Sequence, residues 1–296
     1  MTRPPIGFIG LGLMGSAMVE CLQSNGYALT VMANRSRTNV DAALSRGAAE
    51  AASAREVAEA SDIVMLCMDT SASVEARMLG EDGVIAGLRE GATVIDFGTS
   101  LPGSTTMLGE RVAAAGGTLL DAPLGRTPAH AVDGLLNIMC AGDETAFRRV
   151  KPVLDDLGEN VFHLGRLGNG HTLKLVNNFV GMTMATAIAE AFAMADRAGL
   201  ERQALYDVMS AGPLHSGMMD FVKARAVDGD ATKLEFTIRN ARKDVGYYST
   251  MADDLGATSL MSPATKSALG LATAQGHGDE MVSQMSDWFT ELFKAE

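Results

Sequence analysis

Residues 6–18 read "IGFIGLGLMGSAM", an apolar run that passes through three glycines into a helix-forming segment. Gly10, Gly12 and Gly15 stand in G-x-G-x-x-G spacing. In such a turn the first glycine permits a tight bend, the second a close approach of pyrophosphate, and the third close helix–strand packing. The helix N-terminus adds N–H donors and partial positive charge. The stretch therefore predicts a dinucleotide-binding turn, with Gly10, Leu11, Gly12, Leu13, Met14 and Gly15 as cofactor contacts.

The first half of the chain repeats this order of strand and helix. Up to about residue 165, short apolar runs alternate with amphipathic segments, several of which end in glycine. The runs are IGFIG, LTVMA, DIVMLC, ATVIDF, GTLLDA, NIMCAG and NVFHLG. This alternation is typical of a parallel sheet covered by helices, so we expect an α/β, Rossmann-type doubly wound domain over residues 1–165.

The pattern in residues 166–296 is helical throughout. Residues 173–199, "LKLVNNFVGMTMATAIAEAFAMADRAG", run without proline to a closing glycine and are nearly continuously apolar. We therefore expect one long inter-domain helix, buried on most sides. The helical segments that follow predict an all-α C-terminal domain for substrate binding and oligomerisation.

Composition narrows the classes of protein. The chain has 296 residues with 47% hydrophobic and 20% charged residues, and its net charge of −12 argues against binding to nucleic acid or anionic membranes. Polar residues interrupt the longest apolar region, which argues against a membrane span. Three well-separated cysteines without CxxC indicate a reducing, cytoplasmic location. The five histidines lack metal-ligand spacing, so no metal site is expected.

The end of the second apolar run bears on the choice of dinucleotide. An NAD site usually has Asp or Glu there, which accepts hydrogen bonds from the ribose hydroxyls. This chain reads "VMANRSRT" instead, with Asn34, Arg35 and Ser36 and no acid. Arginine suits a 2′-phosphate, so we expect NADP(H) to be preferred and NAD(H) to be possible. A solvated loop arginine is the alternative.

Polar residues cluster near the start of the long apolar helix. Lys174, Asn177 and Asn178 have i, i+3, i+4 spacing and share one face. We interpret Lys174 as the proton donor in a carbonyl reduction and Asn178 as the residue that orients it or binds a substrate hydroxyl. The alternative is a snorkelling lysine with asparagines that cap loops. For His171 we expect a surface role, and periodicity alone makes Lys243–Asp244 a solvated helix face.

Four motifs in order, "GFIGLGLMGSAM", "DAPLGRTPAHAVDGLL", "GNGHTLKLVNNFV" and "RKDVGYY", resemble those of the β-hydroxyacid dehydrogenase family over nearly the whole chain. The resemblance implies a Rossmann domain and a helical domain through which subunits associate, as a homodimer or homotetramer. It implies that Lys174 is the catalytic lysine and Asn178 its partner. It further implies that Thr99 lies near the nicotinamide, that Met68 and Asp69 form a cofactor turn, and that Lys243 closes over the cofactor.

The second motif departs from the common pattern of the family. Most members have Ser-Gly-Gly after "DAPV", whereas this chain has Gly125, Arg126 and Thr127. The same replacement resembles the 3-sulfolactaldehyde reductase branch. A tetrahedral sulfonate gains from a guanidinium fork and a hydroxyl around its three oxygens. We therefore expect reduction of a short anionic aldehyde to its hydroxy acid, with Asn177 as a further substrate contact. The favoured reaction converts 3-sulfolactaldehyde to 2,3-dihydroxypropane-1-sulfonate.

Two alternatives remain open at this point. The first is a carboxylate semialdehyde reductase or 3-hydroxy acid dehydrogenase that acts on tartronate, succinic or methylmalonate semialdehyde. The second is a non-catalytic NADPH-binding protein on the same scaffold.

Overall fold

The computed structural model describes residues 3–34 and 37–294. It divides into two compact units, Met1–Lys174 and Leu175–Glu296. The division falls inside one long helix, whereas the sequence interpretation divides the chain between residues 165 and 166. The two units are described separately below.

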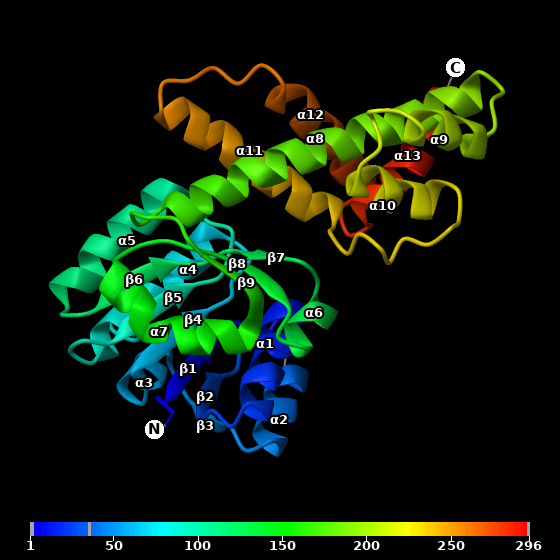
Figure 1. Cartoon of the computed structure of the whole chain (residues 1–296). Coiled ribbons are helices and arrows are strands. Elements are labelled where there is room, and N and C mark those ends of the chain that lie inside the picture. The colour runs from blue at the N-terminus through cyan, green and yellow to red at the C-terminus, as the bar shows by residue number, and fades with distance from the viewer. Residues whose placement is uncertain (1–2, 35–36, 295–296) are drawn as a thin grey trace. The chain divides into compact units, whose positions relative to one another are not determined.

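The first unit is built on a six-stranded parallel sheet with the order β3-β2-β1-β4-β5-β6 (Figure 1). This is the strand order of a Rossmann fold, so the predicted fold class is confirmed. Chain order reverses between β1 and β4, which neighbour each other at the centre of the sheet. The carboxyl ends of strands at such a reversal are where ligands bind in this fold. The strands are Ile6–Ile9 (β1), Leu29–Met32 (β2), Ala49–Ala51 (β3), Ile63–Leu66 (β4), Thr93–Asp96 (β5) and Thr118–Asp121 (β6).

Both faces of this sheet are buried. Phe8 belongs to one apolar cluster and its neighbour Ile9 to another, and Met65 and Val64 divide in the same way. Because successive side chains of a strand point to opposite faces, the two clusters are the two covered sides of the sheet. The covering segments are Leu13–Ser24 (α1), Thr38–Ser45 (α2), Ala54–Glu59 (α3), Ser71–Met78 (α4), Val84–Gly87 (η1), Pro102–Ala114 (α5), Pro128–Val132 (α6) and Glu144–Leu157 (α7).

The expectation of one sheet for all seven apolar runs is wrong. The last two runs form a separate sheet of order β7-β8-β9, with strands Leu124–Gly125, Leu136–Cys140 and Gly158–His163. β8 pairs antiparallel with β7 and parallel with β9. Buried and half-buried residues alternate along β8, whereas β1 is buried throughout. This alternation is typical of a strand with one covered face and distinguishes β8 from the central strands. The sequence interpretation also missed β3, two of whose three residues are exposed.

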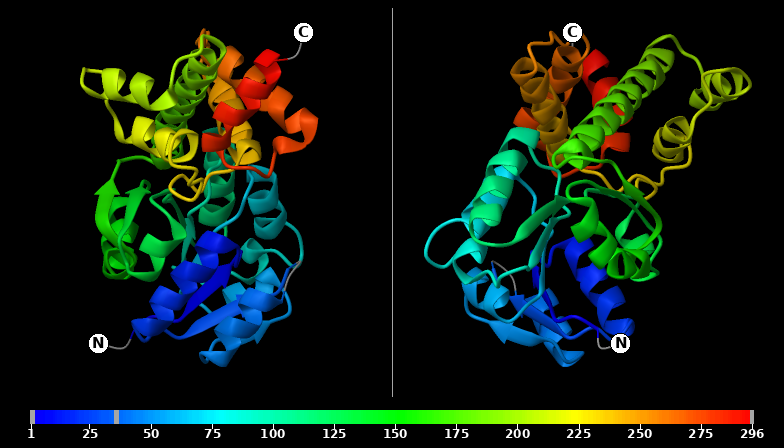
Figure 2. Two further views of the ribbon diagram at one scale, coloured as in Figure 1. Left: turned by 90° about the vertical axis from the view of Figure 1, so that its right-hand side faces the viewer. Right: turned by 60° about the vertical axis from the view of Figure 1, so that its left-hand side comes forward.

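The described part of the second unit contains helices and no strand, apart from an isolated bridge between Thr237 and Met281. Figure 2 shows these helices from two further sides. One apolar cluster, which includes Phe192, Val222 and Trp288, forms the core. The helical segments are Asn169–Arg197 (α8, which begins in the first unit), Arg202–Ser210 (α9), Gly217–Ala226 (α10), Ile238–Asp254 (α11), Ser262–Ala272 (α12), Thr273–His277 (η2), Val282–Gln284 (η3) and Met285–Lys294 (α13).

Helix α8 is less buried than its apolar sequence predicts. Leu173, Val176, Val180 and Met194 are 41–54% exposed, so the expected burial on most sides is wrong for the single chain. Their spacing of three, four and fourteen residues places them along one stripe of the helix. α8 is also long and apolar enough to meet a membrane-span criterion, which core helices of water-soluble proteins meet as well. Gly199, with a φ of +74°, follows its end.

Candidate active site

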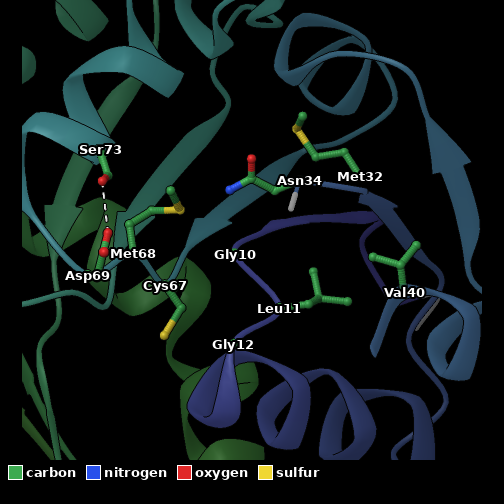
Figure 3. A pocket seen from close by; sticks show the side chains of 10 residues that line it. All are labelled: Gly10, Leu11, Gly12, Met32, Asn34, Val40, Cys67, Met68, Asp69 and Ser73. Carbon is green, nitrogen blue, oxygen red and sulfur yellow. Dashed lines mark hydrogen bonds between the residues drawn. The ribbon is translucent and has the colours of Figure 1, made fainter. Parts of the chain in front are cut away.

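A pocket of about 320 Å³ lies at the carboxyl ends of β1, β2 and β4 (Figure 3). It brings together predicted cofactor contacts from three separate parts of the sequence. The lining residues are Gly10, Leu11, Gly12, Met32, Asn34, Val40, Cys67, Met68, Asp69 and Ser73. Two further predicted contacts in the same turn are not among these lining residues. Leu13 is 82% exposed, and Met14 packs against the core of the first unit.

The three glycines of the turn have different surroundings. Gly10 has a φ of +99°, and a Cβ there would meet the carbonyl oxygen of Cys67. A Cβ at Gly15 would meet the carbonyl oxygen of Gly10, so that glycine permits the close approach of α1 to β1. A Cβ at Gly12 would meet nothing within 4 Å. The protein alone therefore requires the first and third glycines, whereas the second leaves open space of the kind that a pyrophosphate needs.

The N-terminus of α1 adjoins this open space. Its N-cap is Gly12, no side chain caps the helix, and its first turn contains no acidic residue. The first N–H groups of a helix have no partner within the helix and carry partial positive charge. The turn therefore has the backbone room and the donors that fit the pyrophosphate of a dinucleotide.

One end of the pocket lies where β2 ends. Asn34 lines the pocket, and its Oδ1 accepts a hydrogen bond of 2.8 Å from Nη2 of Arg77 on α4. The predicted contacts Arg35 and Ser36 lie outside the described residues. Arg37 bonds to Glu50 and Asp41, and these bonds raise its pKa further. Sequence reasoning missed Arg77, which lies 43 residues beyond Asn34 and has no motif around it.

The turn after β4 supplies the opposite wall. Oδ1 of Asp69 accepts a hydrogen bond of 2.8 Å from the Ser73 hydroxyl, and Met68 also lines the pocket. Cys67 lies between this turn and the glycines. Burial, together with the charge of Asp96, raises the pKa of its thiol to about 12, so the group is neutral at physiological pH. Thr99 follows β5 in a half-buried loop.

The loop after β7 contains Arg126, the only residue other than glycine in the described chain with a positive φ, +79°. Its Nη1 donates to the carbonyl oxygen of Leu135 at 2.6 Å and also pairs with Glu159. Thr127 is the N-cap residue of the next helix, α6, and its hydroxyl lies 2.8 Å from Nδ1 of His130. Gly125 ends β7. The loop therefore presents a cation and a hydroxyl on neighbouring residues, although the guanidinium already has a carboxylate partner.

Lys174 lies directly beside this loop. Its ammonium group donates a hydrogen bond of 2.7 Å to the carbonyl oxygen of Leu124, and the side chain is half-buried. Leu124 immediately precedes Gly125 in the chain. The structure thus brings together two features, the lysine of α8 and the Gly-Arg-Thr loop, that are 50 residues apart in sequence.

The start of α8 is anchored by a buried polar cluster. Asp121, at the end of β6, accepts hydrogen bonds from the N–H groups of Gly168 at 2.8 Å and His171 at 2.7 Å. The imidazole of His171 lies 3.7 Å from Asp96 and 2.7 Å from the Thr105 hydroxyl. His171 is fully buried, so the expected surface role is wrong. Burial raises the pKa of Asp121, and the neighbouring imidazole and the N–H donors oppose this rise.

In the second unit, the amide of Asn178 donates a hydrogen bond of 2.6 Å to Asp244. Asp244 is 1% exposed, so the solvated helix face that periodicity predicts for this pair is wrong. Nζ of Lys243 lies 3.0 Å from the other carboxylate oxygen of Asp244. Asn177 is exposed, and its Nδ2 lies 3.3 Å from Oδ1 of Asn178. Of the two asparagines, Asn178 is therefore buried and Asn177 is exposed.

No group of three or more His, Cys, Asp or Glu side chains within residues 3–34 and 37–294 has the arrangement of a metal site.

Two family sequence models match the chain in tandem. The NAD-binding domain of 6-phosphogluconate dehydrogenase matches residues 5–165, and the NAD-binding domain of NADP-dependent 3-hydroxyisobutyrate dehydrogenase matches residues 168–289. This chain belongs to the β-hydroxyacid dehydrogenase family. As a β-hydroxyacid dehydrogenase, it binds NAD(P) and is an oxidoreductase that acts on CH–OH groups. Its activity is of the hydroxyacid dehydrogenase or semialdehyde reductase type.

Three relatives indicate how far the similarity extends. Glyoxylate/succinic semialdehyde reductase 1 of Arabidopsis thaliana is 28% identical over 93% of this β-hydroxyacid dehydrogenase and 94% of its own length. 2-Hydroxy-3-oxopropionate reductase of Escherichia coli K12 is 37% identical over 68% of this chain and 69% of its own. The solved 3-hydroxyisobutyrate dehydrogenase of Mycobacterium tuberculosis has a TM-score of 0.83 and 26% identity, covering 97% of this chain and 99% of its own.

Proposed function

We propose that this protein is an NADPH-preferring reductase of short anionic aldehydes, with 3-sulfolactaldehyde as the favoured substrate and 2,3-dihydroxypropane-1-sulfonate as the product. The observation that carries the proposal is the hydrogen bond of 2.7 Å from Lys174 to the Leu124 carbonyl. It holds an ammonium group beside a loop with a cation and a hydroxyl, in the same unit as the glycine turn. A proton donor and an anion-binding loop are what reduction of an anionic aldehyde requires.

Each candidate site residue of the first unit is assigned a task in this reaction. The glycine turn would hold the pyrophosphate of NADPH, and the bound cofactor would supply the hydride for the reduction. Lys174 donates the proton that the resulting alkoxide needs, and in the reverse direction the neutral amine accepts it. Thr99, Met68 and Asp69 contact the cofactor.

Residues of the second unit have supporting tasks. Asn178, held by Asp244 at 2.6 Å, orients the lysine or binds a substrate hydroxyl. Lys243 closes over the cofactor, and Asn177 contacts the substrate. On this proposal the functional division of the chain lies between residues 165 and 166.

The anionic tail of the substrate is assigned to Arg126 and Thr127. Arg126 holds an unfavourable left-handed backbone conformation, and such strain is common at ligand-binding positions. Its guanidinium must exchange Glu159 for the substrate anion, and it keeps its positive charge in doing so. Three sulfonate oxygens can accept from the guanidinium fork and the hydroxyl together, which favours the sulfonate.

The second candidate substrate class is a carboxylate semialdehyde, such as tartronate, succinic or methylmalonate semialdehyde. The names of the Arabidopsis and Escherichia coli relatives favour it. The test is the kcat/KM of the purified protein for sulfonate and carboxylate aldehydes, each with NADPH and NADH. A strong carboxylate preference would remove the sulfonate assignment. NADPH binding without turnover of any aldehyde or hydroxy acid would favour a non-catalytic NADPH-binding protein.

A loop variant sharpens this comparison. Arg126→Gly removes the guanidinium and suits the φ of +79°. We expect kcat/KM for the sulfonate aldehyde to fall by at least about tenfold, the value of one charge-assisted hydrogen bond, with a smaller loss for carboxylate aldehydes. An equal loss for both classes would contradict a role in choosing the anion.

The preference for NADP(H) over NAD(H) rests on the absence of an acid after β2 and on Arg35. We expect Arg35→Asp to weaken NADPH binding much more than NADH binding, because it replaces a cation near the 2′-phosphate by an anion. Equal loss for both cofactors would refute this role.

We also propose a cytoplasmic homodimer or homotetramer. Helix α9 buries none of its residues within the chain, and Val208 on it is 75% exposed. The exposed stripe of α8 adds further uncovered apolar surface, which a second copy of the chain would bury. Sedimentation or light scattering of the purified protein tests this, and a monomer at micromolar concentration would refute it.

A further inference from the structure

We propose that Arg77 on α4 gives the pocket its selectivity for a 2′-phosphorylated ribose. This inference rests on the proposed preference for NADP(H). It assigns that preference to a residue outside the "NRS" segment of residues 34–36. The starting observation is the hydrogen bond of 2.8 Å from Arg77 Nη2 to Asn34 Oδ1. Asn34 lines the pocket at the end of β2, where a Rossmann fold binds the adenosine ribose.

The partner of Asn34 determines which of its groups remains for a ligand. A guanidinium has five N–H donors and no acceptor, so only the oxygen of the amide can face Arg77. The nitrogen of Asn34, which carries two donors, is then the group left for the pocket. Figure 3 shows this side chain extending from the end of β2 among the lining residues. A donor suits phosphate oxygens, whereas the Asp or Glu of an NAD site offers acceptors to the ribose hydroxyls.

The charge of Arg77 is the second part of the argument. Among the described residues, no carboxylate lies within ion-pair distance of Arg77, and its bonded partner is a neutral amide. Arg37, the other described arginine close to the end of β2, is held by Asp41 at 3.0 Å and Glu50 at 2.9 Å. An arginine bonded to a neutral group keeps its full attraction for an incoming phosphate.

The position of Arg77 on α4 agrees with this task. Ser73 lines the pocket, and Arg77 follows four residues later, on the same face of the helix. The only carboxylate among the pocket-lining residues is Asp69, which follows β4 and accepts a hydrogen bond from Ser73. The β2 end of the pocket therefore offers an amide nitrogen and, behind it, a guanidinium.

The test uses adenosine fragments, so that it does not depend on turnover. Calorimetry would compare adenosine 2′,5′-bisphosphate with adenosine 5′-diphosphate on the full-length protein and on Arg77→Gln. Glutamine can still donate to Asn34 but carries no charge. We expect the affinity for the 2′-phosphorylated fragment to fall about ten- to a hundredfold, the value of a charge-assisted hydrogen bond, and that for the other fragment to change less than about twofold.

Three further variants complete the test. Arg77→Lys keeps the charge but loses the fork, so we expect an intermediate loss. Asn34→Asp would pair with Arg77 and add acceptors, so the preference should shift toward the fragment without a 2′-phosphate. Arg55→Gln, on α3, removes an exposed arginine that is paired with Glu59 and should leave both affinities unchanged. Melting temperatures establish that each variant is folded.

Equal weakening of both fragments in folded Arg77→Gln, or no weakening of either, would overturn the proposal. A wild-type protein that prefers adenosine 2′,5′-bisphosphate but reduces no aldehyde would refute the proposed function and leave the role of Arg77 intact. A protein that reduces aldehydes while Arg77→Gln keeps the wild-type fragment preference would refute the role of Arg77 and leave the proposed function intact.

Discussion

The side-chain nitrogen of Lys174 lies 2.7 Å from the carbonyl oxygen of Leu124. The neighbouring residues after Leu124 are Gly125 and Arg126, so this hydrogen bond fixes the ammonium group next to the Gly-Arg-Thr loop. The base of α8 is fixed in turn, because the buried carboxylate of Asp121 holds two N–H groups at its start. The lysine therefore has a rigid support on both sides, as a positioned proton donor requires.

Replacement of Lys174 should strongly reduce turnover without loss of cofactor binding. We expect Lys174→Ala to lower kcat about 10²- to 10⁴-fold, the usual contribution of a positioned acid or base. Steady-state kinetics and calorimetry with NADPH check the two parts. Lys151→Ala is the matched control, since Lys151 is half-buried, as Lys174 is, and its described partner is Asp155. Turnover within about tenfold of the wild type would exclude Lys174 as the proton donor.

The Asn178–Asp244 pair should act as one unit. Asn178→Asp would place two buried carboxylates at a contact that is now 2.6 Å, so we expect a lower melting temperature and a large loss of kcat. Asn178→Ala and Asp244→Ala should each reduce kcat, and the double variant should lose less than the product of the two. Independent, multiplicative losses in this double-mutant cycle would show that the contact has no part in activity.

The three glycines of the turn should respond differently to alanine. Gly10→Ala and Gly15→Ala place a Cβ against backbone carbonyl oxygens, and we expect each to cost about 1–3 kcal/mol of the free energy of unfolding. The Cβ of Gly12→Ala meets open space, so the free energy of unfolding should change by less than about 1 kcal/mol. The affinity of Gly12→Ala for NADPH should nevertheless fall at least about tenfold, because the methyl group occupies the space of the pyrophosphate. Denaturant unfolding and calorimetry measure the two effects, and tight NADPH binding by Gly12→Ala would contradict the placement of the pyrophosphate.

The cysteines should be inert in the native protein. Burial raises the pKa of the Cys67 and Cys140 thiols to about 12, and it also raises the pKa of Cys21. Only the thiolate reacts, so alkylation by iodoacetamide at about pH 8 should be slow and should accelerate about tenfold per unit of pH below these pKa values. Mass spectrometry of alkylated native and urea-unfolded protein checks this. Rapid native alkylation of Cys67 at neutral pH would contradict a neutral thiol beside the glycine turn.

Local patterns in the sequence were sufficient for the fold class. The G-x-G-x-x-G turn and the alternation of apolar runs with amphipathic segments predicted the Rossmann unit, because a central parallel strand is buried on both faces and reads as a continuous apolar run. The same patterns failed for β8 and β9. These strands are also short and apolar, and composition alone does not reveal which strand is their partner.

The polar contacts required the three-dimensional structure. Asn34 and Arg77 are 43 residues apart, and Asn178 and Asp244 are 66 apart. His171 and Asp244 are polar residues that the sequence interpretation places at the surface, yet both are buried. A buried polar side chain is stable when a partner satisfies it, and that partner comes from a distant element. Periodicity records which face of an element is apolar, whereas the folded chain establishes which distant side chain completes each polar pair.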